Sequence, residues 1–245
     1  MIKFFRKIRQ NLLTENKTGK YFKYAIGEIV LVVIGILIAL QINNWNQDIT
    51  SKNELEQILK EVSNDLEQDI FWLDQQIENG EGFVNNVDYL LGNGNNMPVD
   101  SLLHRISAVY RYTYFIPVSF GYNKFNKHPR TELLPDRLTN DITIYYSGFS
   151  IERNSISLEI NTLYSLNAFR NYLVKYGFPL EVNELKRLED LSNLNDIIND
   201  IEFIGILRTI KNNWSVELYV LNTARTMAKN NLETINNYLS SINGF

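Results

Sequence analysis

The chain has 245 residues, of which 44% are hydrophobic and 21% are charged, and its formal net charge at pH 7 is −4. This length can bury a sizeable hydrophobic core, and this composition excludes an intrinsically disordered chain. The sequence contains no cysteine, which excludes disulfide bonds, thiolate metal sites and cysteine nucleophiles but does not identify the compartment.

The charges are distributed unevenly along the chain. Residues 1–23 contain seven basic side chains and one acidic side chain, whereas residues 43–245 contain 17 basic and 26 acidic ones. In the first segment apolar residues recur at helical spacing opposite the basic ones: Ile2, Phe5, Ile8 and Leu12. Such a basic amphipathic helix binds an anionic membrane surface. Nucleic acid is the competing partner for this charge, but the apolar segment that follows favours the lipid bilayer, so we expect no nucleic-acid partner.

Residues 24–42 predict one membrane-spanning helix. Their nineteen positions, YAIGEIVLVVIGILIALQI, would form a helix of about 28 Å, close to the roughly 30 Å of a bilayer's hydrocarbon core. The uninterrupted apolar part, residues 29–40, would also suit a buried helix of a soluble protein. Its insertion free energy of about −5 kcal/mol, however, outweighs a cost of at most about 3 kcal/mol for Glu28. We therefore expect an uncleaved anchor rather than a core helix or a signal peptide, which needs small residues at its cleavage site.

The flanks of this helix predict its orientation. The side richer in Lys and Arg stays in the cytoplasm, so residues 1–23 are predicted to be cytoplasmic and residues 43–245 to lie across the membrane. Aromatic residues that favour the interface stand at both ends of the span: Tyr21, Phe22, Tyr24 and Trp45.

Four residues within the predicted span are candidates for contacts between membrane helices. Gly27, Gly35 and Ala39 share one face, and the last two form a small-xxx-small pair that lets two helices of a homo-oligomer approach closely. Small residues are also common in membrane helices without such a role. Glu28 is either an interfacial carboxylate paired locally or a group with a proton-transfer or partner-binding role.

The stretch FFRKIRQNLLTENKTGKYFKYAIGEIVLVVIGILIALQINNWN, residues 4–46, resembles the start of a bacterial membrane-protein family known as domain of unknown function family 6090. The resemblance implies a bacterial inner-membrane protein with a periplasmic helical domain. It implies no activity and no catalytic residues.

Beyond Trp45, apolar residues recur at threes and fours and predict an amphipathic helix that continues from the membrane helix: Leu55, Ile58, Leu59, Val62, Leu66, Ile70, Leu73 and Ile77. Glycine favours helix C-termini, so we expect this helix to end near residues 79–82. A shorter helix over residues 83–91, a loop over residues 92–98 and a helix from Asp100 to about Tyr110 follow.

The second half of the chain predicts more helices after an aromatic connector. Residues 110–125 are rich in Tyr and Phe and contain Pro117 and Gly121, which predicts an irregular segment with at most a short strand. Helical patterns cover residues 135–176, with a break at Gly148, and then about residues 185–194 and 200–242. The predicted fold is all-α: an N-terminal transmembrane helix (24–42) after a cytoplasmic segment (1–23), followed by an extracytoplasmic antiparallel helical bundle with coiled-coil character (43–245).

The sequence predicts no catalytic site, no metal site and no cofactor. His104 and His128 are the two histidines, and neither lies near an acid cluster. The carboxylates Asp65, Glu67 and Asp69 are interpreted as a solvated helix face. The best candidate for a ligand or partner surface lies within residues 110–130, where aromatic and cationic side chains alternate: Tyr112, Tyr122, Lys124, His128 and Arg130. Alternatively, these aromatic residues cap the bundle core and the cations face water.

Three functions are consistent with these features. The first is a membrane-anchored interaction or scaffold component of the bacterial envelope that contacts an unknown envelope protein. The second is a ligand-sensing periplasmic bundle that signals through a partner, since residues 39–79 are free of Pro and Gly and predict a continuous helix. The third is an enzyme with an unrecognised site.

Overall fold

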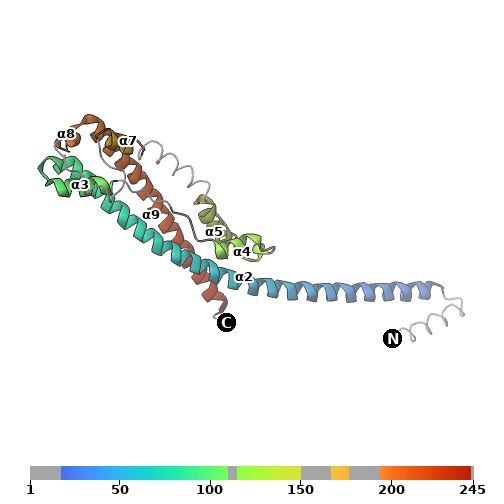
Figure 1. Ribbon diagram of the computed structural model, residues 1–245. Coiled ribbons are helices and arrows are strands. Elements are labelled where there is room, and N and C mark those ends of the chain that lie inside the picture. The colour runs from blue at the N-terminus through green and yellow to red at the C-terminus, as the bar shows by residue number, and fades with distance from the viewer. Residues whose placement is uncertain (1–17, 110–114, 150–166, 177–193, 244–245) are drawn as a thin grey trace. The chain divides into compact units, whose positions relative to one another are not determined.

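The computed structural model describes residues 18–109, 115–149, 167–176 and 194–243 (Figure 1). In these ranges the regular structure is entirely helical, which confirms the predicted all-α class. The α-helices are α2 (Thr18–Asn93), α3 (Val99–Ala108), α4 (Phe120–Lys127), α5 (Asp136–Gly148), α7 (Asn167–Lys175), α8 (Leu194–Asn199) and α9 (Ile201–Asn243). Short 3-10 helices cover Gly94–Asn96 and Thr131–Leu133.

The chain divides into two compact units, Met1–Glu54 and Leu55–Phe245. In the first unit, α2 contains an eighteen-residue window with a mean hydropathy of 2.6, and none of this window is buried by the described residues. The apolar side chains from Ile26 to Ile42 are accordingly exposed. This helix is long and apolar enough to cross a membrane.

The second unit is built on an antiparallel pair made by α2 and α9. Ion pairs give the direction: Asp74 with Arg225 (3.0 Å) and Asp88 with Lys211 (2.5 Å). Buried residues alternate at spacings of three and four along both helices, as in a coiled-coil seam. On α2 they include Leu55, Leu59, Val62, Leu66, Asp69 and Leu73, and on α9 they include Phe203, Leu207, Ile210, Trp214, Glu217, Leu221, Ala224 and Ala228.

Two hydrophobic cores lie along this helix pair. The first core joins α2 up to Ile77 with α4, α5 and the part of α9 beyond Leu218. The second core joins residues 83–90 of α2 with α3, α7, α8 and residues 203–214 of α9. The shorter helices therefore complete the two cores. The predicted bundle consists of the α2–α9 pair with these helices packed along it.

The predicted end of the helix near residues 79–82 is wrong, because α2 continues to Asn93. Gly80 is buried in the helix interior, where α9 crosses closely: a Cβ at this position would lie 2.8 Å from Leu218 and 3.0 Å from Trp214. Glycine here serves close packing rather than helix termination. Because α2 does not end at these glycines, residues 83–91 are part of α2 and not a separate helix as predicted.

The aromatic connector is only partly as predicted. Residues 115–119 are irregular, but residues 120–127 form α4 instead of continuing an extended segment. The first turn of α4 rests on the backbone of α2, since a Cβ on Gly121 would lie 2.5 Å from the Val62 nitrogen. Residues 110–114 lie outside the described ranges, as do residues 150–166 and 177–193. The break at Gly148 and the long last helix agree with the prediction.

Candidate functional site

The structure places the predicted aromatic and cationic surface on α4 and the turn that follows it. The ring of Tyr122 stacks on that of Tyr146, with centroids 4.2 Å apart. Lys124 pairs with Glu61 of α2 (2.7 Å), and Arg130 pairs with Glu132 (2.5 Å). The backbone N–H of Arg130 donates to Nδ1 of His128 (3.2 Å). Tyr112 lies outside the described ranges.

These contacts bring Lys124 onto α2 and the Tyr122 ring onto α5, and they give each of the two cations Lys124 and Arg130 its own carboxylate. The Arg130 backbone N–H bonds to His128, whereas its guanidinium bonds to Glu132 in the following turn. A shared pocket that uses all four side chains remains a prediction.

The candidate membrane contacts all lie on the exposed part of α2. A Cβ on Gly27 or Gly35 would meet nothing within 4 Å, so both positions are open to another helix. Ala39 is exposed and Glu28 is partly exposed on the same helix. A contact between two copies of this helix remains a prediction.

Two carboxylates buried under α4 form the most unusual polar site among the described residues. Asp69 is fully buried and Asp65 is 3% exposed, whereas Glu67 is exposed. The interpretation of all three as a solvated face is therefore wrong for Asp65 and Asp69. Both lie on the face of α2 that the 115–122 segment covers, and they stand one helical turn apart.

Backbone N–H groups of that segment bond to the two carboxylates. Asp69 Oδ1 accepts from the Val118 N–H (2.8 Å), and Asp65 Oδ2 accepts from the Gly121 N–H (2.6 Å). The second oxygen of Asp69 accepts from the Tyr145 hydroxyl of α5 (2.8 Å). These three hydrogen bonds attach the start of α4 and Tyr145 of α5 to α2.

Tyrosine rings surround this carboxylate pair. Tyr146 is buried between Tyr122, on which it stacks, and Tyr145, whose ring is nearly perpendicular to its own. The hydroxyl of Tyr146 is buried and has no hydrogen-bond partner among the described residues. Burial and the charges of Asp69 and Asp65 raise the pKa of this phenol, so the hydroxyl lies within electrostatic reach of both carboxylates.

Burial also changes the titration of the carboxylates. It raises the pKa of Asp69 to about 7, with a further increase from the charge of Asp65, although the Val118 N–H and the Tyr145 hydroxyl act in the opposite direction. Burial raises the pKa of Asp65 as well, against the N–H groups of Gly121 and Tyr122 and the charge of Lys124. Of the two, Asp69 therefore titrates near neutral pH.

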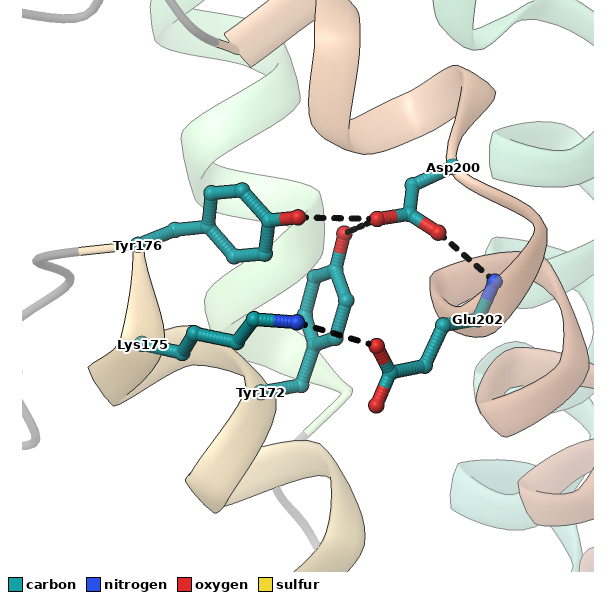
Figure 2. Close-up of polar contacts among 5 residues, drawn as sticks. All are labelled: Tyr172, Lys175, Tyr176, Asp200 and Glu202. Atoms are coloured by element: carbon teal, nitrogen blue, oxygen red, sulfur yellow. Dashed lines mark hydrogen bonds and ion pairs between the residues drawn. The ribbon is translucent and has the colours of Figure 1, made fainter.

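A second polar cluster fastens α7 to the start of α9 (Figure 2). The hydroxyls of Tyr172 and Tyr176 both donate to Oδ2 of Asp200, at 2.8 and 2.9 Å, while Oδ1 accepts from the Glu202 N–H at 2.7 Å. Lys175 pairs with Glu202 (3.2 Å). Asp200 thus caps α9, and the Tyr172 hydroxyl is the main cause of its lowered pKa. All its groups are paired, which is typical of a structural joint.

An open groove of about 560 Å³ lies between α5 and α9. Its lining is polar, with the amides of Asn230, Asn231 and Asn237 and the charged groups of Arg137, Asp141 and Glu233. Asn231 is buried and donates to the Asp141 carbonyl (3.2 Å), so it ties the two walls together. In the described part of the chain, no group of three or more His, Asp or Glu side chains could hold a metal ion.

Comparison with known proteins gives a family but no function. A family model described as a family of unknown function, DUF6090, matches residues 28–168, more than half of the chain. No curated protein and no solved structure matches the chain. The match begins inside the stretch of residues 4–46 that carries the sequence resemblance, and it extends through the carboxylate pair, α4 and α5. The chain therefore belongs to the DUF6090 family.

Proposed function

We propose that this protein is a membrane-anchored helical bundle of the bacterial envelope that binds another envelope protein. In this proposal residues 24–42 span the inner membrane once, residues 1–23 lie in the cytoplasm and the bundle lies in the periplasm. The observation that carries the proposal is an apolar window in α2 that none of the described residues buries.

Water is a poor environment for that window. Apolar surface left in water costs about 25 cal/mol per Å², and the side chains of Ile29, Leu31 and Leu37 are each more than half exposed. A core helix of a soluble protein would be covered by its own chain, and the described residues do not cover this one. A lipid bilayer would cover all sides of this helix at once, and the basic residues before it favour the cytoplasmic side for the N-terminus.

A binding role rather than catalysis suits the second unit. Its buried Asp65, Asp69 and Asn231 join segments to one another, and the lining of its open groove between α5 and α9 presents amides and charges but no His or Ser side chain. We place the contact with the partner protein at this groove. Its polar lining can satisfy the donors and acceptors of a partner's surface.

Site-specific photo-crosslinking in living cells tests this placement. A photoreactive amino acid replacing Asn237, in the groove, should yield a discrete crosslinked protein. The same replacement at Asn212, an exposed asparagine on α9 outside the groove, should not. Equal yields at both positions, or no adduct at Asn237, would contradict the binding role of the groove.

A ligand sensor is the second candidate, because α2 is one helix from Thr18 to Asn93. Such a helix joins the apolar segment to both cores without an intervening loop. A sensor bundle is stabilised by its ligand, so a thermal-shift screen of the full chain in detergent should find a small molecule that raises the melting temperature. A scaffold should respond to its partner protein alone.

A further inference from the structure

We propose that Asp65 and Asp69, together with Tyr145, form a proton-operated latch that fastens residues 118–122 to α2. With one proton held on the carboxylate pair, the latch is closed. Loss of that proton leaves two buried negative charges and loosens the segment. This device goes beyond the anchoring and binding roles, and it gives the second unit two states.

The geometry leaves the second negative charge without compensation. The pair accepts hydrogen bonds from the backbone N–H groups of Val118, Gly121 and Tyr122 and from the Tyr145 hydroxyl, and each of these bonds favours an ionised carboxylate. The two carboxylates nevertheless stand at positions i and i+4 of one helix, where like charges repel. Two charges in so buried a site cost more than these donors supply without a cation.

The charged and titratable groups around the pair are mostly acids, and the charge of Lys124 has the smallest effect among the causes that shift the pKa of Asp65. On α2 they are Glu61 and the pair itself, on α4 Tyr122 and Lys124, and on α5 Tyr145 and Tyr146. Lys124 is exposed and already pairs with Glu61. From α9, Arg225 pairs with Asp74, five residues further along α2. Tyr146 adds a buried hydroxyl without a partner among the described residues, so the site holds more polar groups than its hydrogen bonds use.

The sign of the pH effect follows from the direction of the titration. Burial raises the pKa of Asp69 from an ordinary value of 3.8 to about 7. The closed latch therefore binds a proton that the open segment releases, and closure is favoured most at acid pH. The advantage is lost steadily as pH rises from about 4 to about 7, and opening changes little above that range.

The part that opens is defined by the same bonds. Val118 and Gly121 are the residues whose N–H groups the carboxylates hold, and Gly121 is the point at which α4 lies closest to the backbone of α2. Without these bonds the start of α4 loses its polar attachment to α2. The second core contains neither residue, so it should not respond to this titration.

Amide hydrogen exchange on the full chain in detergent micelles tests the latch. After correction for the intrinsic pH dependence of exchange, protection of the Val118 and Gly121 amides should fall at least about tenfold between about pH 5.5 and about pH 8.5. The Leu207 amide, in the second core, should keep the same protection factor. Equal protection of Val118 and Gly121 at both pH values would overturn the proposal.

Variants separate a proton latch from a purely structural contact. Asp69→Asn cannot ionise and should keep Val118 protected at both pH values. Asp65→Asn removes the repelling charge, so Asp69 should ionise more easily and its pKa should fall. Tyr145→Phe removes a donor to the ionised form and should raise that pKa. Asp74→Asn, on the same helix, should leave it unchanged.

The test does not depend on the Asp69→Asn variant alone. If that variant does not fold, Asp65→Asn should lower the pKa of Asp69 and Tyr145→Phe should raise it, and these opposite shifts test the latch. Shifts of the Val118 exchange midpoint in one and the same direction would overturn the latch.

Discussion

Glu217 lies at the boundary between the two cores, after Trp214 of the second and before Leu221 of the first. Its side chain is 7% exposed, and burial is the cause that shifts its pKa, with no contribution from a hydrogen bond or a charge of the described residues. Burial raises its pKa, so the folded protein favours the neutral acid. Such a group costs stability whenever the pH requires it to ionise.

Replacement of Glu217 by Gln should therefore stabilise the protein at neutral and alkaline pH by about 1 kcal/mol or more. The raised pKa means that the penalty grows as pH rises above the ordinary value of 4.5, so wild type and variant should converge in acid. Melting temperatures in detergent at several pH values measure this difference. Glu233→Gln, at an exposed position of α9, should have no effect, and a Glu217→Gln variant that melts below wild type at about pH 8 would refute the account.

The burial of Asp69 was only in part predictable from the sequence. Asp69 lies three residues after Leu66 and four residues before Leu73, both of which are buried. This spacing predicts that Asp69 lies on the buried face of α2. A carboxylate at such a position is usually a surface residue, and only the Val118 and Gly121 N–H groups make the burial of this pair tolerable. These donors arrive from about fifty residues away, through a turn that no local pattern specifies.

Among the helices, those with long apolar stripes were predictable from the sequence, but the role of the glycines within them was not. The stripe of α9 predicted its bounds to within one residue at each end. Gly80 and Gly82 of α2 suggested a C-cap, but Gly80 sits against α9 and Gly82 faces open space. In α4, a short helix is held by Asp65 and by contact with Val62, and neither interaction is visible in the local sequence.

The two glycines give a matched test of this packing. Gly80→Ala should destabilise the bundle by about 1 to 3 kcal/mol, because its Cβ would meet Leu218 at 2.8 Å. Gly82→Ala has open space around it and should stabilise the helix by about 0.5 to 1 kcal/mol. Chemical unfolding in detergent compares the two variants. Equal effects of both substitutions would show that α9 does not approach α2 closely at Gly80.

At the scale of the whole molecule, composition and hydropathy were sufficient for the all-α class and for the apolar N-terminal helix, because both are properties of long segments. The division of the bundle into two cores was not predictable. It depends on which short helices pack on which part of the α2–α9 pair, and α3, α7 and α8 have ordinary amphipathic patterns that fit either core.

Cysteine labelling tests directly whether α2 crosses the membrane with the bundle outside the cytoplasm. The chain has no cysteine of its own, so Asn16→Cys and Asn53→Cys each introduce a single thiol, one on each side of the proposed span. A maleimide that enters the periplasm but does not cross the inner membrane should label intact cells carrying the Asn53→Cys variant. The Asn16→Cys variant should react only after the inner membrane is opened. Labelling of position 16 but not position 53 in intact cells would contradict the proposed topology.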